Sequence, residues 1–242
     1  MASKQKTVIV TGASQGIGAG VVQSFLDRGY NVVANSRKIK KSGAFSESDH
    51  LALVDGSIGD SAVAAKIVET AAQKFGSIDA LVNNAGIFFT KPFADYTSED
   101  FQALSSTNLE GFLYVTQRAV EQMLAQKSGG SIVSVTAALA VNPIAGIKAS
   151  VPMLTKGGLE AVTLSLATEY ARENIRFNAV APGVVDTPLH KDEPKDFLKT
   201  LSPMGTISDV KDIVDAVVYL TEARHVTGEV LHVDGGAHSG KW

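Results

Sequence analysis

The stretch TGASQGIG, Thr11–Gly18, decides the fold of this chain. It joins a β-branched run that starts at Thr7 to the segment GAGVVQSFLDRG, where apolar residues recur at three- and four-residue steps, as in a helix. Gly12, Gly16 and Gly18 let the backbone turn tightly and approach a pyrophosphate, whose charge would face the amino end of that helix. Glycines also make ordinary turns, so the triplet alone is a weak signal, but its strand–loop–helix context favours nucleotide binding.

Outward from this loop, short β-branched runs alternate with helical patterns over the whole chain. Nearly unbroken hydrophobic runs joined by helices predict a parallel sheet covered on both faces. We therefore expect one Rossmann-type, doubly wound α/β domain over residues 1–242, with a seven-stranded parallel sheet flanked by helices. The runs are Thr7–Gly12, Asn31–Ser36, Leu51–Gly56, Asp79–Gly86, Ser131–Ala137, Ile175–Gly183 and Glu229–Gly236. The charged segment at 187–205 departs from the alternation and is interpreted as a mobile flap.

Composition excludes several classes of protein. A length of 242 residues with 45% hydrophobic content suits one domain with a substantial core. The net charge of -3 and an isoelectric point near 6 give no reason to expect nucleic acid or an anionic membrane as partner. The chain has no cysteine, and its five histidines lack metal-ligand spacing, so neither disulfides nor a metal are expected. Without an apolar bilayer-length run or a signal-peptide core, the protein is expected in the cytoplasm.

The end of the second strand bears on which nucleotide would bind. NAD sites usually place an acid about 20 residues beyond the glycine loop to hold the ribose 2′-hydroxyl. This chain has Asn35, Ser36, Arg37 and Lys38 there, and the next acid is Glu47. Arg37 can stack on adenine and pair with a 2′-phosphate, and the Ser36 hydroxyl can donate to it. A solvated basic turn is the alternative, but the position favours NADP(H) as cofactor, with NAD(H) as the second option.

Several motifs, in order, give the chain a resemblance to the short-chain dehydrogenase/reductase family along almost its whole length. Together they are a far stronger signal than the glycine loop alone. They are TGASQGIG, Asp55 after the third strand, NNAG at Asn83–Gly86, Asn108 in STNLEGF, Lys156 in LTKGG, APGVVDTP at Ala181–Pro188, and the terminal VDGG.

The resemblance implies a cofactor site assembled from several strand ends. It places Asp55 near the adenine amino group, the residues after the fourth strand along the adenosine ribose, and those after the sixth strand against the nicotinamide carboxamide. Lys156 would bind the nicotinamide ribose hydroxyls. The implied cofactor residues are Gly12, Ser14, Gln15, Gly16, Ile17, Gly18, Ser36, Arg37, Asp55, Gly56, Asn84, Ala85, Gly86, Lys156, Pro182, Gly183, Val185 and Thr187.

The family's proton-transfer residues, a serine, a tyrosine, a lysine and an asparagine, are only half present. Asn108 and Lys156 match, but Pro152 occupies the tyrosine position. Depending on the register chosen, the serine position falls on Ala137 or Leu139, and the nearest hydroxyls are those of Thr136 and Ser134. Proline is well tolerated in the first turn of a helix, with Ser150 as the predicted cap, but it has no proton to give.

Three residues are therefore the catalytic candidates: Asn108, Lys156 and Thr136. A hydride arriving at a carbonyl leaves an alkoxide, which needs a proton donor nearby. Lys156 could only bind ribose, or it could also deliver the proton, directly or through a water shared with Asn108. A lysine beside a cationic nicotinamide should titrate low, which suits that role. Lys148 and His190 are more distant candidates.

Two functions remain open from the sequence. One is an NADPH-dependent carbonyl reductase, reversibly an alcohol dehydrogenase, with an altered proton donor. The other is an NADP-binding scaffold or sensor without turnover. The substrate would be a small carbonyl or alcohol. On the resemblance, the residues around the nicotinamide face would be Phe88, Phe89, Ile144, Ile147, Val151, Met153 and Leu189, which suggests an apolar ketone or ketoester, although ordinary packing would explain all seven.

The resemblance also implies assembly. Helices around Asn108–Gln126 and Pro152–Arg172 commonly pair between subunits of the family, which predicts a homodimer or homotetramer. The closing segment HVDGGAHSGKW is expected to reach a neighbouring subunit.

Overall fold

A computed structural model of the chain describes residues 5–240 and contains a seven-stranded sheet in which every neighbouring pair is parallel. The strand order is β3-β2-β1-β4-β5-β6-β7. This confirms the predicted Rossmann-type architecture. The strands are β1 (Thr7–Thr11), β2 (Asn31–Ser36), β3 (Leu51–Asp55), β4 (Ala80–Asn83), β5 (Gly130–Val135), β6 (Ile175–Pro182) and β7 (Val230–Val233).

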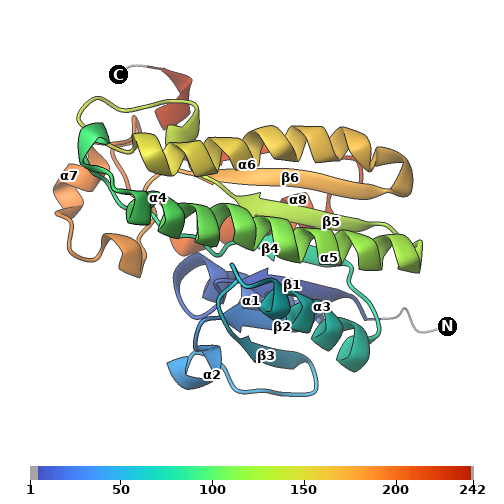
Figure 1. The fold of residues 1–242 in the computed structure, drawn as a ribbon. Coiled ribbons are helices and arrows are strands. Elements are labelled where there is room, and N and C mark those ends of the chain that lie inside the picture. Colours follow the sequence, from blue (N-terminus) through green and yellow to red (C-terminus); the bar gives the residue numbers. More distant parts are fainter. Residues whose placement is uncertain (1–4, 241–242) are drawn as a thin grey trace.

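Helices cover both faces of this sheet (Figure 1). On the near face of Figure 1 lie α3 (Ser61–Phe75), α4 (Ser98–Ser105), α5 (Gly111–Gln126) and α6 (Ser150–Glu169). On the far face α1 (Gly16–Asp27) packs against α8 (Val210–Glu222). The short helices α2 (Ile39–Ser42) and α7 (Lys195–Lys199) lie at the periphery.

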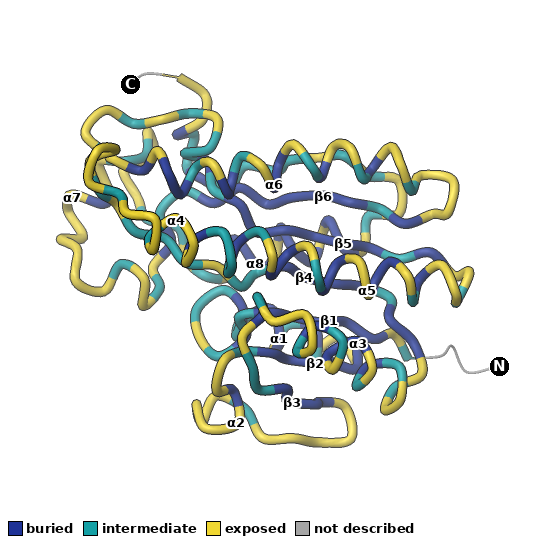
Figure 2. Tube along the Cα trace, in the orientation of Figure 1, coloured by how far each residue is buried: buried dark blue, intermediate teal, exposed yellow. Residues whose placement is uncertain are grey.

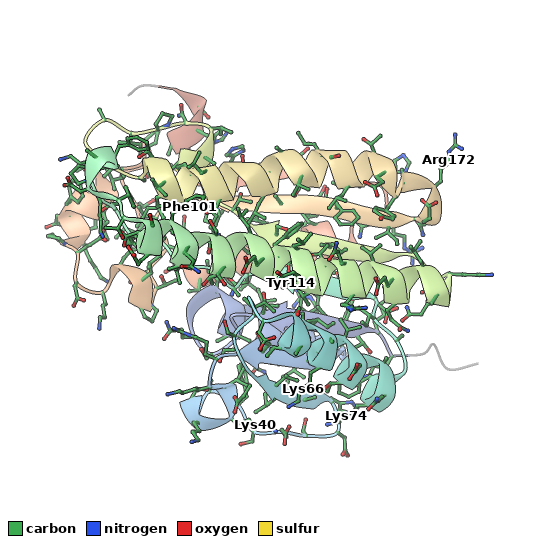
Figure 3. The ribbon with its side chains drawn as sticks, viewed as in Figure 1. Lys40, Lys66, Lys74, Phe101, Tyr114 and Arg172 are labelled. Carbon is green, nitrogen blue, oxygen red and sulfur yellow. The ribbon has the colours of Figure 1, made fainter. Side chains whose placement is uncertain are left out.

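Alternate residues of each strand pack in two separate hydrophobic cores, because successive side chains on a strand point to opposite faces of the sheet. Val8 and Val10 of β1 belong to the core with residues of α1 and α8, whereas Ile9 belongs to the core with residues of α3 and α5. Tyr114 of α5, labelled in Figure 3, packs against this second core. With both faces covered, the strands are buried along most of their length (Figure 2) and can be apolar throughout.

The strand order reverses between β1 and β4, which are neighbours although two strands separate them in sequence. In open α/β sheets the crevice at the carboxyl ends of such strands is where ligands bind. The glycine loop follows β1, and the NNAG motif spans the end of β4. The fold therefore brings the two motifs together at the same edge of the sheet.

The predicted flap at 187–205 contains two short helices, η5 (Pro188–His190), which begins at Pro188, and α7, whose N-cap is Pro194. Its mobility stays a prediction. The predicted cap Ser150 is instead the first helical residue of α6. Ala149 takes the cap position and offers no side-chain acceptor, so the prediction of a serine cap was wrong.

Within residues 5–240, no helix has the length and apolar character needed to cross a membrane.

Candidate active site

The glycine loop is shaped by contacts that leave no room for side chains. Gly12 and Gly16 have φ angles of +65° and +54°, in the left-handed region that favours glycine. A Cβ on Gly12 would lie 2.7 Å from the Ala85 Cα, and one on Gly18 would overlap the Gly12 carbonyl oxygen. The helix α1 begins at Gly16, and the side chain of its N-cap residue Gln15 makes no capping bond. The first N–H groups of α1 can therefore receive a phosphate.

Thr11 ties the glycine loop to the end of β4. Its hydroxyl oxygen accepts hydrogen bonds from the backbone N–H groups of Asn84 and Ala85, at 3.1 and 3.0 Å. The Asn84 amide in turn donates to the carbonyls of Thr11 and Gly12, at 3.0 and 3.1 Å. Asn84 thus supports the loop with its side chain, whatever it contributes to a ribose. The role of Thr11 was missed, since a threonine at a strand end carries no distinctive spacing.

The adenosine end of the site is formed by the ends of β2 and β3. Ser36 is half-buried and Arg37 is exposed, so the guanidinium is accessible to a ligand. The Gly56 N–H donates to the Ser36 carbonyl at 3.1 Å, which joins the two strand ends. One oxygen of the Asp55 carboxylate accepts from the Lys40 N–H at 3.0 Å. This bond holds α2 beside the sheet edge that carries Arg37.

The segment after β6 folds back over the glycine loop. The Gly183 N–H donates to the Val233 carbonyl at 3.0 Å, and a Cβ on Gly183 would lie 2.9 Å from the Asp234 Cα. A Cβ on Gly16 would lie 3.4 Å from the Thr187 Cγ2. The loop after β6 is therefore close enough to the glycine loop to close over a ligand lying between them. Of the remaining predicted residues in this segment, Pro182 and Val185 are buried.

Asn108 lies in the π-helical segment η2 (Ser106–Glu110), which joins α4 to α5. Single π-helical turns inside helices are frequent at functional sites. The Asn108 side chain accepts from the Ile87 N–H at 2.9 Å and donates to the Ile87 carbonyl at 3.1 Å. Its amide also donates to the Thr155 hydroxyl at 2.9 Å, and that hydroxyl donates to the Pro152 carbonyl at 2.8 Å. Asn108 is thereby anchored to both the β4 loop and α6, and Thr155 was not identified from the sequence.

Lys156 is a buried lysine, only 9% exposed, whose ammonium donates to the Val135 carbonyl at 2.8 Å. Burial lowers the pKa of Lys156 to about 8, against a smaller opposing effect of the Glu160 charge. A Cβ added to Gly86 would lie 3.2 Å from the Lys156 Nζ and 3.3 Å from the Asn108 Oδ1. The structure therefore brings Lys156 and Asn108, 48 residues apart in sequence, to the same point beside the NNAG motif.

The two family positions that lack a hydroxyl lie nearby. Pro152 is buried in the first turn of α6, and Ala137 follows the end of β5. The Thr136 hydroxyl has two acceptors within reach, the Glu160 carboxylate at 2.8 Å and the Val180 carbonyl at 3.2 Å. Thr136 is therefore bonded to the interior side of α6, away from the position that Ala137 occupies. Glu160 was not singled out in the sequence, although its spacing of four residues from Lys156 is a usable signal.

The loops that follow β4 and β5 form the expected substrate side. The Lys91 N–H donates to the Lys148 carbonyl at 3.1 Å, which joins the loops. The Tyr96 hydroxyl accepts from the Lys91 N–H at 3.1 Å and donates to the Phe89 carbonyl at 3.0 Å. Of the seven apolar residues predicted here, Val151 is buried, Leu189 is 55% exposed and the other five are half-buried. No group of three His, Cys, Asp or Glu among the described residues is arranged to hold a metal ion.

The chain is similar to known proteins in both sequence and fold. A family model described as Enoyl-(Acyl carrier protein) reductase matches residues 12–238. The 3beta-hydroxysteroid dehydrogenase 1 of Eggerthella lenta is 34% identical, covering 96% of this chain and 94% of its own length. The crystal structure of 3-ketoacyl-(acyl-carrier-protein) reductase from Brucella melitensis complexed with NADH superposes with a TM-score of 0.90 at 30% identity, over 98% of this chain and all of that one. The structure of ElxO with NADP bound also has a TM-score of 0.90, at 28% identity, with the same coverage.

Proposed function

Because the chain belongs to the short-chain dehydrogenase/reductase family, we propose that it is an NADP(H)-dependent oxidoreductase that reduces a ketone or aldehyde carbonyl and, in reverse, oxidises the alcohol. The observation that carries this proposal is the meeting of Lys156 and Asn108 beside Gly86, next to a glycine loop whose cramped geometry suits a pyrophosphate. Dinucleotides bound in two of the similar structures support the same cofactor class. When bound, the reduced nicotinamide supplies the hydride.

The chain's own residues would handle the proton. Lys156 is buried, its Nζ borders Gly86, and its pKa is about 8, so its ammonium can give up a proton near neutral pH. Asn108 is fixed by three hydrogen bonds and can hold a water between the ammonium and the substrate oxygen. A positioned general acid contributes roughly 10²–10⁴-fold, so loss of the family's tyrosine slows such a reaction without abolishing it.

The preference for NADP(H) rests on the end of β2. Arg37 is exposed, and the neighbouring Asp55 carboxylate is engaged by the Lys40 N–H at 3.0 Å. A guanidinium can bind a 2′-phosphate through two parallel hydrogen bonds, with Ser36 as a further donor. NAD(H) lacks that phosphate and would lose these bonds. NADP(H) is therefore the favoured cofactor.

A second candidate is a nucleotide-binding scaffold or sensor without turnover. Pro152 and Ala137, both without a transferable proton, favour it. In that case the glycine loop and Lys156 would bind the cofactor, and no carbonyl would be consumed.

One experiment distinguishes the two functions. Oxidation of NADPH is followed by its absorbance with a panel containing an aryl ketone, a ketoester, a steroid ketone and a β-ketoacyl thioester, against a control without substrate. Tight NADPH binding with turnover of at least one carbonyl supports the reductase. Tight binding without any turnover in either direction contradicts it and supports the scaffold.

We also propose that the protein is a homo-oligomer, a dimer or tetramer built on α5 and α6. Both helices present exposed leucines, Leu113 and Leu124 on α5 and Leu154 and Leu164 on α6, each at least 40% exposed. Phe101, on α4, is 48% exposed and is labelled beside the start of α6 in Figure 3. Large apolar patches on a monomer's surface commonly mark protein interfaces.

A further inference from the structure

Glu160 is a buried carboxylate, 6% exposed, one helical turn beyond Lys156 on α6. Residues four apart on a helix lie on the same face, so the two side chains approach the sheet side by side. Each is held by one of two consecutive residues at the end of β5. The Val135 carbonyl accepts from Lys156 at 2.8 Å, and the Thr136 hydroxyl donates to Glu160, also at 2.8 Å.

The Thr136 hydroxyl suits a carboxyl group that changes its protonation state. A hydroxyl has one proton to donate and can also accept. When Glu160 is ionised, Thr136 donates to it. When Glu160 is protonated, the acid can donate to Thr136, whose proton then turns to the Val180 carbonyl, 3.2 Å away. Both protonation states of Glu160 therefore have a hydrogen-bond partner inside the fold.

Charged groups on the elements packed against α6 are engaged elsewhere or exposed. Glu110 of η2 is exposed, and Asp100 of α4 is paired with Lys91 at 2.6 Å. Arg176 of β6 donates to the carbonyls of Leu220, Thr221 and Val226. The charge that acts on Lys156 is that of Glu160, which raises the pKa of the lysine and so opposes the stronger effect of its burial. Burial in turn raises the pKa of Glu160.

We propose that Glu160, held by Thr136, is a positioning residue for Lys156, whose carboxylate keeps the neighbouring ammonium protonated and so available to donate. This inference rests on the proposed function, in which Lys156 supplies the proton. Without the negative charge, a buried ammonium would lose its proton at lower pH, because burial favours the neutral form. Glu160 would thus set the upper pH limit of the reduction without touching substrate or cofactor.

The test compares Glu160→Gln with the wild type, because an amide keeps the size and the oxygen that Thr136 binds but removes the charge. We expect the alkaline limb of the pH–rate profile for ketone reduction to move down by about one unit, the lower end of the shift produced by a nearby opposite charge. Glu169→Gln is the matched control, since Glu169 is an exposed glutamate at the far end of the same helix. It should leave the limb in place.

A readout without turnover separates this inference from the proposed function. Lys156 should bind ribose hydroxyls better when charged, so the dissociation constant of NADPH, measured by fluorescence from pH 6 to 10, should rise through the titration of Lys156. The midpoint of that rise should also move down by about one unit in Glu160→Gln. If the wild type reduces no carbonyl but this midpoint moves, the proposed function fails and the role of Glu160 stands.

Two outcomes overturn the inference: an unchanged midpoint in Glu160→Gln, or an equal shift in Glu169→Gln. If Glu160→Gln does not fold, Thr136→Val and Thr136→Ser decide. Removing the Thr136 hydroxyl takes away a hydrogen bond that stabilises the ionised form of Glu160. Thr136→Val should therefore move the midpoint for NADPH binding down, and Thr136→Ser should restore it. Equal midpoints in these two variants contradict the proposal. If Glu160 had a purely structural role, its replacement would lower the melting temperature. The alkaline limb of the pH–rate profile and the midpoint for NADPH binding would then stay in place.

Discussion

The ammonium of Lys156 and the carbonyl of Val135 are joined by a 2.8 Å hydrogen bond that fixes the lysine at the end of β5. One donor is used in this bond, and an ammonium has three. The Nζ also borders Gly86, where a Cβ would lie 3.2 Å away. Lys156 can therefore stay anchored to the sheet while it binds a ribose or a water on the Gly86 side.

Replacing Lys156 should cost more in kcat than in cofactor affinity. Lys156→Ala removes both the ribose contact and the proton route, and we expect kcat to fall by roughly 10²–10⁴-fold. Lys156→Arg keeps the charge but should be nearly as damaging, because a guanidinium does not deprotonate in proteins. Steady-state ketone reduction and separate NADPH titrations measure the two effects. If Lys148→Ala or His190→Ala lowers kcat by this factor and Lys156→Ala does not, the proton travels by another route.

The buried lysine should also shape the pH dependence of stability. Its folded-state pKa of about 8 lies below the unfolded value of 10.5, so its stabilising contribution is present above pH 10.5 and is lost as pH falls through 8. At about 1.4 kcal/mol per pKa unit, the charged buried lysine lowers the free energy of unfolding by about 3 kcal/mol at pH 7. Lys156→Met should therefore unfold at higher denaturant concentration than the wild type at pH 7. The difference in denaturation midpoint between the two proteins should shrink as pH rises from 8 to 10.5. A difference that is constant with pH would contradict this prediction.

Pro152→Tyr should speed the reaction. Pro152 is buried one turn before Lys156 and faces the same side of α6, so a phenol there would stand near the ammonium. We expect kcat to rise, up to about the 10²-fold lower bound for general acid catalysis. Pro152→Phe is the control, since it adds the ring without the proton. Equal rates in the two variants would show that the added hydroxyl does not reach the substrate oxygen.

Arg37→Asp should reverse the cofactor preference. The change removes the partner of the 2′-phosphate and adds a like charge, so NADPH binding should weaken by about 1.5–3 kcal/mol, the range for a hydrogen bond to a charged group. NADH binding should be unchanged or improved. Both cofactors are titrated into both proteins, with Lys66→Asp on α3 (Figure 3) as the control for net charge. A wild type that binds NADH more tightly than NADPH would refute the assignment.

The oligomer should depend on the exposed leucines of α6. Sedimentation at micromolar concentration should give a mass of at least twice 25.4 kDa. Leu154→Glu with Leu164→Glu should reduce it to a single chain, because buried unpaired charges are costly at an interface. The control is Met204→Glu, at a residue that is 71% exposed and lies outside these helices. A wild type that sediments as one chain would rule out the proposed assembly.

The alternation of strands and helices, the parallel sheet and the glycine loop could all be predicted from the sequence. These features depend on local patterns: apolar periodicity sets the element type, and the glycines of TGASQGIG are where side chains would collide, as the Gly12 and Gly18 contacts show. The boundaries of the strands were close for the same reason, with β2 observed at Asn31–Ser36 as predicted. The N-cap of α6 was not predicted correctly, because the path of the preceding loop places Ala149 at that position.

The surroundings of Lys156 were decided only by the tertiary structure. Asn108 reaches Lys156 beside Gly86, and Thr136 binds Glu160 one turn further along α6, although these pairs are 48 and 24 residues apart in sequence. Thr136 could be chosen from the sequence as a hydroxyl near the family's serine position. The direction in which its side chain points depends on how α6 packs against the end of β5. The pKa of Lys156 depends on burial by all of these elements at once. A residue's type is written in the sequence, whereas its solvent exposure and its charged neighbours exist only after the helices have packed on the sheet.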